Sequence, residues 1–267
     1  MKVTVNGVWK ETSAGTAFML RAETFPDREV LVLNGFQISE DAVLHDGDHV
    51  YIGKKGVFPE RDELHALMSA RHTPGVHARV SGATVGVAGL GGLGSNIVAM
   101  LARLGVGRLV IADFDVIEPT NLNRQNYYVE HIGMSKAKAT ADAVGRINPF
   151  IEVVTHDVRI TPDNAASMFG GCDVVCEAFD SPTEKAMIVN TLMEKCPGLA
   201  LVCGSGLAGF GDSNDIHTVK RMGNLYVCGD GFSAARIGTG LMSPRVGICA
   251  GHMANAVLRL LMGEEIR

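Results

Sequence analysis

A glycine-rich turn between an apolar run and a helical pattern is the feature that most constrains the fold of this chain. The turn reads GLGGLG at 89–94; the apolar run Thr84–Ala88 precedes it, and the segment Leu93–Leu104 continues as a helix. This spacing fits G-x-G-x-x-G, in which backbone N–H groups approach phosphate oxygens beside the positive end of a helix dipole. The turn therefore predicts a strand–loop–helix unit that binds a nucleotide. Its loop glycines are Gly89, Gly91 and Gly94.

Strand and helix patterns alternate through the rest of the chain. Further continuous apolar runs fall at Leu109–Ala112, Ile151–Val154, Val174–Ala178 and Leu199–Cys203, and helical segments at Lys136–Ile147 and Thr183–Lys195. Continuous apolar runs are typical of parallel strands that are buried on both faces. We expect an α/β fold over residues 81–267, a doubly wound, Rossmann-like and mostly parallel sheet. Residues 215–228 predict two more strands, and 245–262 a last helix.

The first 56 residues have a different pattern. Asn6-Gly7 and Asn34-Gly35 each separate two short apolar segments, which is a strong hairpin signal. A helix is expected over Thr12–Ala22. The order of hairpin, helix and strands is that of a small β-grasp (ubiquitin-like) domain over 1–56. Residues 57–80 predict a helical connector, with Glu60–Arg71 as its helix.

Composition narrows the class of protein. The net charge of −5 gives no general attraction for nucleic acid or for an anionic membrane, and the N-terminus lacks the apolar core of a signal peptide. The six cysteines form no C-x-x-C pair, so we expect free thiols and no zinc. These features predict a soluble cytoplasmic protein with no nucleic-acid or membrane partner.

Asp113 stands at the end of the second predicted strand of the larger domain. A carboxylate at this place accepts hydrogen bonds from ribose hydroxyls in dinucleotide-binding folds. The glycine loop and this acid leave NAD, FAD and ATP open as ligands.

Three charged residues favour ATP among these ligands. Arg124 and Lys136 supply two cations close to the predicted phosphate loop, and Asp180 follows the strand Val174–Ala178. Arginine grips phosphate oxygens bidentately, lysine acts as a movable charge, and a carboxylate holds Mg²⁺ that bridges phosphates. Taken singly, each residue also suits a surface or capping role, so the prediction depends on their joint placement.

Five motifs carry a resemblance to a known family. They are GLGGLGSN at 89–96, DFD at 113–115, NLNRQ at 121–125, GMSK at 133–136 and EAFD at 177–180. Over residues 66–265 the chain resembles the ThiF/MoeB-type adenylating enzymes, which are relatives of the ubiquitin-activating enzymes. Residues 1–56 are similar to the sulfur carrier ThiS, so the whole chain looks like a ThiF-like protein of thiamine biosynthesis with a fused β-grasp domain.

The resemblance implies ATP-dependent adenylation of the terminal Gly-Gly carboxylate of a small β-grasp sulfur carrier. It implies that Asp113 binds ribose, that Asp180 holds Mg²⁺, and that Arg71 reaches the partner's site in a homodimer. The nucleotide is further surrounded, on the same grounds, by Asp115, Asn121, Arg124, Gln125 and Lys136. Two C-x-x-C pairs for zinc and a crossover-loop cysteine, found in some members, are absent; Cys228 ends the preceding strand.

Other functions stay open at this point. A nicotinamide or flavin oxidoreductase would use the same glycine loop, and a non-catalytic module would merely dock a carrier. Within the family, the acceptor is alternatively a molybdopterin-type carrier or an RNA base, although the net acidity disfavours RNA. The fused domain itself lacks a carrier's free glycine tail, because Ile52-Gly53-Lys54-Lys55-Gly56 runs on into the connector. It is therefore expected to dock the separate carrier, steady the dimer or cover apolar surface.

Overall fold

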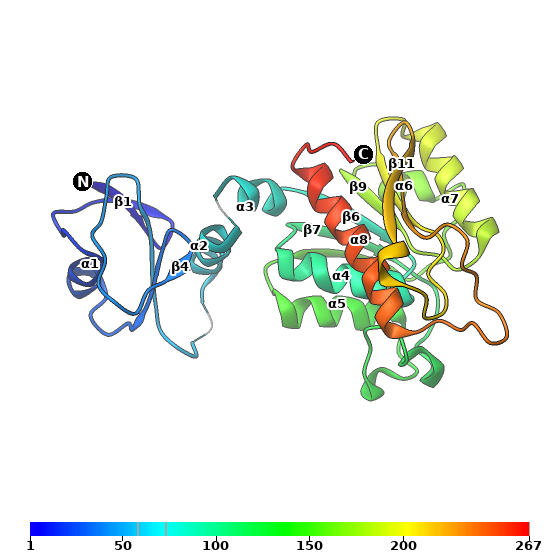
Figure 1. The fold of residues 1–267 in the computed structure, drawn as a ribbon, viewed down its shortest axis with the longest axis horizontal. Coiled ribbons are helices and arrows are strands. Elements are labelled where there is room, and N and C mark those ends of the chain that lie inside the picture. Colours follow the sequence, from blue (N-terminus) through cyan, green and yellow to red (C-terminus); the bar gives the residue numbers. More distant parts are fainter. Residues whose placement is uncertain (58, 73, 267) are drawn as a thin grey trace. The chain divides into compact units, whose positions relative to one another are not determined.

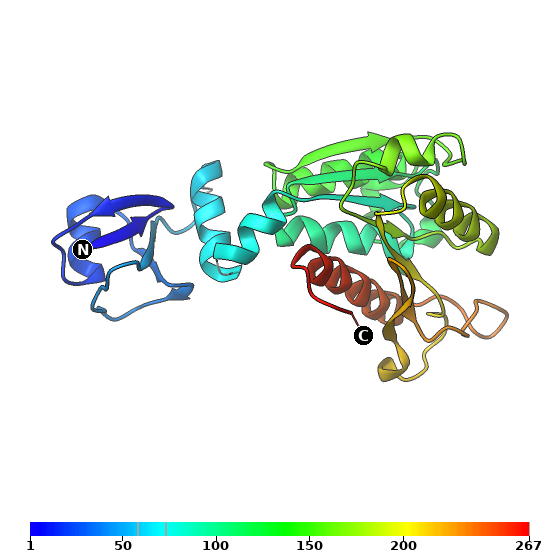
Figure 2. The ribbon, with the colours of Figure 1, turned by 90° about the horizontal axis from the view of Figure 1, so that it is seen from above.

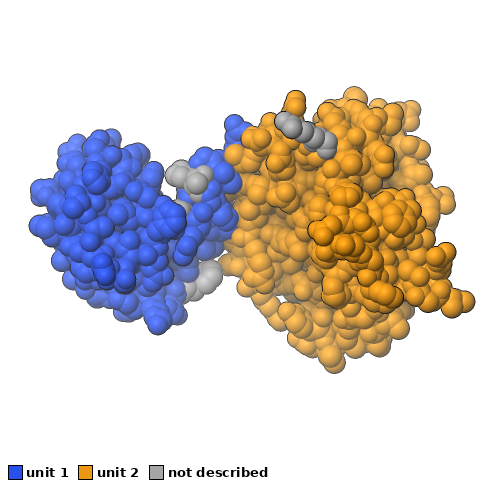
Figure 3. Space-filling model, viewed as in Figure 1, with its two compact units in different colours: residues 1–79 blue, residues 80–267 orange. Residues whose placement is uncertain are grey.

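The structure is a computed structural model that describes residues 1–57, 59–72 and 74–266. The chain forms two compact units, residues 1–79 and 80–267, which Figure 3 colours separately. Each unit has its own sheet and its own hydrophobic core.

Unit 1 is built on a five-stranded sheet with the strand order β2-β1-β5-β3-β4. Strands β1 and β5 are parallel, and the other neighbours are antiparallel. Helix α1 (Ala17–Thr24) packs on one face, where Val3, Leu20 and Ile52 are fully buried. This arrangement is the predicted β-grasp. Its strands are β1 (Lys2–Val5), β2 (Val8–Glu11), β3 (Val30–Leu33), β4 (Phe36–Gln37) and β5 (His49–Gly53).

Both Asn-Gly pairs form the expected hairpin turns. Asn6 and Gly7 have φ of 49° and 83°, and Asn34 and Gly35 have φ of 50° and 91°. Type I′ turns need this positive φ at both central residues, and their twist matches that of the flanking strands. The turns therefore fix the registers of the β1–β2 and β3–β4 pairs.

The predicted start of the first helix is wrong. The hydroxyl of Thr12 accepts a hydrogen bond from Ala14 N at 3.0 Å, and α1 begins only after Thr16, whose hydroxyl accepts from Met19 N at 3.3 Å. Threonine hydroxyls that bond nearby N–H groups compete with the helix, which explains why residues 12–16 stay outside it.

The connector contains two helices where one was expected. Helix α2 (Arg61–His72) is close to the predicted segment, and a second helix, α3 (Pro74–Ser81), follows it. Glu63 of α2 accepts hydrogen bonds from Arg28 and from Asn6, so α2 packs against the β-grasp part of unit 1. Thr73, part of the predicted helix end, lies outside the described residues.

Unit 2 contains a seven-stranded sheet with the order β11-β12-β10-β9-β6-β7-β8. All neighbours are parallel except β11 and β12, which form an antiparallel hairpin. The strand order reverses between β6 and β9, and ligands of such folds bind at the carboxyl ends of the strands at this point. The strands are β6 (Thr84–Ala88), β7 (Arg108–Ala112), β8 (Glu152–His156), β9 (Val174–Glu177), β10 (Ala200–Gly204), β11 (His217–Met222) and β12 (Leu225–Gly229).

Helices cover both faces of this sheet (Figures 1 and 2). Helix α4 (Gly92–Leu104) packs against α5 (Lys136–Ile147) and α8 (Ser243–Leu261), and α6 (Ala165–Phe169) packs against α7 (Pro182–Lys195). Alternate strand residues such as Val175 and Leu201 face Phe169 and Ile188 in one core cluster. The doubly wound, Rossmann-like prediction is confirmed, whereas α6 was not predicted. Three short 3-10 helices complete the unit, η1 (Pro119–Asn121), η2 (Val129–His131) and η3 (Ser213–Asp215).

Within residues 1–57, 59–72 and 74–266, no helix combines the length and the apolar character needed to cross a bilayer.

Candidate active site

The three predicted loop glycines are glycine for different reasons. Gly89 has φ of 86°, and a Cβ on Gly94 would lie 1.8 Å from the carbonyl oxygen of Gly89. The positive φ requires glycine at position 89, and the close packing of helix against strand requires it at position 94. Gly91 has φ of −75°, and a Cβ there would meet only Gln125 Nε2, at 3.8 Å. The fold alone therefore does not demand glycine at 91, and the free space beside it faces the start of α4.

The peptide groups of Leu90 are held from two sides. Leu90 N donates to Asp113 Oδ2 at 2.6 Å, and Leu90 O accepts from the Tyr127 hydroxyl at 2.8 Å. Burial raises the pKa of the Asp113 carboxyl, while the Lys136 charge and the N–H groups of Asp115 and Leu90 oppose this rise. Asp113 thus shapes the glycine loop in addition to its predicted role at the ribose.

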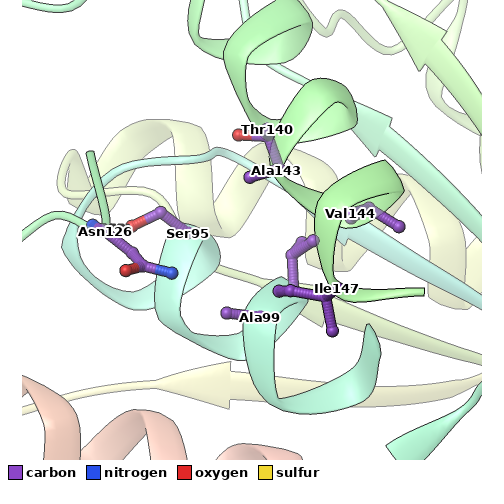
Figure 4. A pocket seen from close by; sticks show the side chains of 8 residues that line it. Ser95, Ala99, Asn126, Thr140, Ala143, Val144 and Ile147 are labelled. Atoms are coloured by element: carbon purple, nitrogen blue, oxygen red, sulfur yellow. Dashed lines mark hydrogen bonds between the residues drawn. The ribbon is translucent and has the colours of Figure 1, made fainter. Parts of the chain in front are cut away.

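The segment that follows η1 is fixed to helix α4 by two polar side chains. Asn96 Nδ2 donates to Arg124 O at 3.0 Å. Ser95 Oγ accepts from Asn126 N at 3.0 Å, and Figure 4 shows these two residues. The pocket between α4 and α5, drawn in Figure 4, has a volume of about 10 Å³. That volume holds at most one water molecule, so it is not a substrate pocket.

Two predicted phosphate-site residues of this segment differ in exposure. Arg124 is half-buried, and its guanidinium donates to Asn123 Oδ1 at 2.8 Å and to Thr120 O at 3.2 Å. Gln125 is buried, and its Oε1 has no hydrogen-bond partner among the described residues. A buried acceptor without a partner is costly unless a ligand supplies a donor. Asn121 anchors the same segment, since its Oδ1 accepts from Glu118 N at 3.0 Å.

Lys136 opens helix α5 and points its ammonium at Asp115. The distance from Lys136 Nζ to Asp115 Oδ2 is 2.7 Å; the lysine side chain is 8% exposed and the aspartate side chain 47%. The backbone N–H of Lys136 also donates to Asp115 O at 2.9 Å. The ion pair therefore has one protected and one accessible partner, and the accessible carboxylate can be displaced by another anion.

A buried ion pair flanks the turn from β9 into α7. Lys185 Nζ donates to both carboxylate oxygens of Glu177, at 2.9 and 3.1 Å, and to Gly204 O at 2.9 Å. Burial raises the pKa of the Glu177 carboxyl, and the Lys185 charge opposes this. Asp180 lies in the same turn with an exposed side chain. No role was predicted for Glu177 or Lys185, although a glutamate at the end of an apolar strand was the available signal.

A second buried ion pair joins α8 to two loops at the same edge of the sheet. Arg245 donates to Asp230 Oδ2 at 2.7 Å, to Gly211 O at 2.7 Å and to Asp212 O at 2.6 Å. Although burial raises the pKa of the Asp230 carboxyl, hydrogen bonds from Ser233, Phe232 and Arg245 lower it to about 2. The sequence analysis missed this pair, because its members are far apart in the chain.

The structure brings most of the predicted site residues to one edge of unit 2. Contacts among neighbours link the glycine loop, the Asp113–Gln125 segment and Lys136, and Gly89 abuts Ala178 at the start of the Asp180 turn. Arg71 belongs to the other unit: it is an exposed residue in the last turn of α2, in unit 1.

The cysteines and other metal-binding side chains do not gather at this site. Among the described residues, no group of three or more His, Cys, Asp or Glu side chains is arranged to hold a metal ion. Burial raises the pKa of five thiols, so they are protonated at neutral pH. These five are Cys172, Cys176, Cys203, Cys228 and Cys249.

Two protein families match the chain. Residues 1–56 match the ThiS-like ubiquitin family, and residues 66–267 match the ThiF family. The two matches correspond to the β-grasp and to the Rossmann-like sheet with part of the connector.

Several characterised proteins are similar to the chain. It shares 32% identity over 191 residues with the adenylyltransferase and sulfurtransferase UBA4 of Yarrowia lipolytica, covering 66% of this chain and 45% of that protein. It shares 40% identity over 104 residues with the probable adenylyltransferase/sulfurtransferase MoeZ of Mycobacterium tuberculosis, covering 39% of this chain and 26% of that protein. The chain thus spans less than half the length of these relatives.

Solved structures share the fold. The E. coli tRNA N6-threonylcarbamoyladenosine dehydratase TcdA, in complex with ATP, superposes with a TM-score of 0.69 at 22% identity, covering 78% of this chain and 97% of that chain. E. coli MccB with ATP gives a TM-score of 0.55 at 20% identity, covering 78% and 64% of the two chains. At such identities the likeness establishes the fold.

Proposed function

Since the chain belongs to the ThiF family, we propose that it adenylates the C-terminal carboxylate of a small ubiquitin-like sulfur carrier, with ATP as the donor. The observation that carries the proposal is the gathering of two cations, Arg124 and Lys136, around a glycine loop at the switch point of the sheet. The adenylyltransferase names of the relatives support the same chemistry.

The residues at the loop suit a triphosphate. Gly91 leaves room for phosphate oxygens at the N-terminus of α4, where backbone N–H groups and the helix dipole favour negative charge. Lys136 can exchange Asp115 for a phosphate, because Asp115 is half exposed and regains water when it is released. Asp113 and Gln125 offer acceptors for ribose or base donors.

The reaction needs positioning and charge stabilisation from the protein. A carboxylate oxygen of the carrier attacks the α-phosphorus, the bond from that phosphorus to the bridging oxygen breaks, and pyrophosphate leaves with the electron pair. Arg124 and Lys136 hold the phosphate oxygens in place and stabilise the charge that develops on them. No covalent protein intermediate is required for this step.

The exposed carboxylate of Asp180 fits Mg²⁺. Mg²⁺ prefers carboxylate oxygens, keeps several waters and is usually bound together with substrate phosphates, so an all-protein cage is not needed. Asp180, at the carboxyl end of β9, is the residue proposed to hold it. When bound, the ion neutralises phosphate charge.

The acceptor is proposed to be a separate carrier that ends in Gly-Gly, and the ThiS-type carrier of thiamine biosynthesis is the first candidate. A molybdopterin-type carrier is the alternative. A slim glycine tail reaches a recessed phosphate more easily than a tail with side chains. Unit 1 is not proposed as the acceptor, because its last strand β5 leads by a short link into α2 and offers no free carboxylate.

The five buried cysteines are not proposed to carry sulfur. Their thiols are protonated and shielded from solvent, so they are poor nucleophiles. We therefore assign this chain the activation step and give these five thiols no covalent role.

A homodimer with shared sites completes the proposal. Arg71 is exposed near the end of α2, and its proposed role is to reach the site of the partner subunit. Its guanidinium would add a third cation to the phosphates there.

The test is an ATP–pyrophosphate exchange assay with a panel of carriers. We expect exchange only when Mg²⁺ and a Gly-Gly-ended carrier are both present, and the most active carrier identifies the pathway. NAD reduction or a flavin absorbance in the purified protein, with no exchange for any carrier, would favour an oxidoreductase and reject the proposal.

A further inference from the structure

The Glu177–Lys185 pair is unusual because it is buried, yet it lies at the ligand-binding edge of the sheet. The side chain of Glu177 is 3% exposed and that of Lys185 is 25% exposed. Replacing a buried ion pair by apolar residues is often neutral or stabilising, so such a pair is weak evidence for a stabilising role. The location suggests a role in the geometry of the site.

The hydrogen bonds of the pair enclose the turn that carries Asp180. Glu177 precedes the turn, and its Oε1 accepts from Phe179 N at 2.7 Å. Lys185 follows the turn in α7 and binds back to Glu177, while the Ser181 hydroxyl accepts from Glu184 N at 3.4 Å as the helix cap. Asp180 is therefore at the tip of a short turn whose two ends are bonded to each other.

Lys185 also attaches this turn to the neighbouring strand. Its third hydrogen bond goes to the carbonyl of Gly204, the last residue of β10. The next residue, Ser205, continues the contact along the edge, since Ser205 N donates to Cys228 O at 2.8 Å. One ammonium group thus links the start of α7 to the ends of both β9 and β10.

We infer that Glu177 and Lys185 are positioning residues that hold Asp180 where it can bind Mg²⁺ with the nucleotide. This inference rests on the proposed function, because it assumes the metal role of Asp180. It adds that the affinity for Mg²⁺ depends on two residues that do not touch the ion.

A substitution of Lys185 should weaken the binding of Mg²⁺ more than the binding of the nucleotide itself. Without the ammonium, α7 loses its bonds to Glu177 and to β10, only the bond from Phe179 N to Glu177 remains, and the Asp180 carboxylate samples more positions. Binding of the ion must then restrict this motion, which weakens it. ATP binding in the absence of Mg²⁺ uses the glycine loop and Lys136, and is expected to change little.

The experiment compares Mg²⁺-dependent ATP binding by calorimetry in the chain of residues 1–267 and in three variants of it. Lys185→Met removes the bonds, Lys185→Arg keeps the charge, and Lys195→Met is the matched control. Lys195 lies on the same helix and also donates to a carbonyl, that of Pro162 at 2.8 Å, but it is exposed. We expect the Mg²⁺ concentration for half-maximal effect to rise about tenfold in Lys185→Met, to rise less in Lys185→Arg and to be unchanged in Lys195→Met.

Hydrogen exchange in the ligand-free protein gives a second readout. The Phe179 amide is bonded to Glu177, so Lys185→Met should speed exchange in residues 178–181 while the strands β6 and β7 keep their protection. If Lys185→Met does not fold, Glu177→Gln decides, because the amide has nearly the same shape but loses the charge and one of the two oxygens that accept from Lys185; it should raise the Mg²⁺ requirement severalfold.

The outcomes distinguish a failure of the proposed metal site from a failure of the positioning role. If the wild type shows no Mg²⁺ effect on ATP binding, the metal part of the proposed function fails. If the wild type responds and the folded Lys185 or Glu177 variants need the same Mg²⁺ concentration, the positioning role is wrong. An Asp180→Asn variant serves as the reference for full loss of the metal effect.

Discussion

The loops after β7 and after β9 each lead to a lysine that pairs with a carboxylate, and the two lysines are held very differently. Lys136 has one hydrogen-bonded acceptor for its ammonium among the described residues, and that acceptor, Asp115, has a side chain 47% exposed. Lys185 has three acceptors, and its partner Glu177 is buried. Lys136 can therefore leave its partner for a ligand, whereas Lys185 cannot leave without stranding a buried charge. Lysine is thus available to bind a ligand after β7, whereas after β9 it maintains the shape of the site.

The sharpest way to break this comparison is to remove Lys136. Lys136→Ala should lower the adenylation rate by about 100-fold or more, because a cation that stabilises developing phosphate charge is lost. The urea midpoint should stay close to that of the wild type, since Asp115 is accessible to water. Exchange kinetics and urea unfolding measure the two effects. Lys138→Ala, an exposed lysine of the same helix, is the control, and near-normal rates in a folded Lys136→Ala protein would contradict the assigned role.

Removing Lys185 should instead lower the stability of the fold. Lys185→Ala leaves Glu177 buried without its cation, which costs about 3 kcal/mol or more of unfolding free energy. Chemical denaturation followed by circular dichroism measures this loss, and Lys195→Ala should show little of it. A midpoint equal to that of the wild type would mean that the pair is accessible to water in solution, and the contrast with Lys136 would disappear.

A test of Arg71 extends the comparison of the two lysines, because it asks whether a third cation comes from the partner subunit. An Arg71→Ala chain and a Lys136→Ala chain are each expected to be weakly active alone. In a mixed dimer, one of the two sites has both residues, so part of the activity should return. Activity is measured on dimers purified through two different tags. A verified mixed dimer without any recovery would count against sharing between subunits.

The smallest expected effect is in unit 1 and concerns a buried histidine. Burial, and then the charges of His65 and His72, lower the pKa of His77 from 6.5 to about 4. Between these values the unfolded chain binds a proton that the folded chain refuses, so the stability of unit 1 is fully present above pH 6.5 and falls as the pH drops toward 4. Fluorescence of Trp9, the only tryptophan, reports this unit in urea titrations.

The control for this prediction is His77→Gln, which keeps a polar side chain but does not titrate. Its stability should fall less than that of the wild type between pH 7 and pH 4.5. Equal losses in both proteins would show that other groups cause the pH dependence.

Much of the fold was predictable from local signals. The Asn-Gly turns and the continuous apolar runs depend on backbone sterics and burial, which act within a few residues. The exact start of α1 was not predictable from hydrophobicity, because the Thr12 and Thr16 hydroxyls decide it. Helix α3 was missed since a proline followed α2, and that proline begins a new helix.

The site was predictable where motifs carry it and not where tertiary contacts do. The glycine loop, Asp113 and Lys136 stand in recognisable spacing. Tyr127 and Arg245, which hold the loops in place, bond to partners that only the folded sheet brings near them. Glu177 was part of the EAFD motif and a charge at the end of an apolar strand, but no local signal linked it to Lys185, which the folded turn brings to it.

The most direct measurement is mass spectrometry of a Gly-Gly-ended carrier after brief incubation with the protein, ATP and Mg²⁺. The account predicts AMP attached to the terminal carboxylate of the carrier, no AMP on residues 1–56 of the enzyme, and far less adduct after the same time when Lys136→Ala replaces the wild type. A carrier that stays unmodified with the active wild-type protein, or AMP found on unit 1 instead, would contradict the central claim.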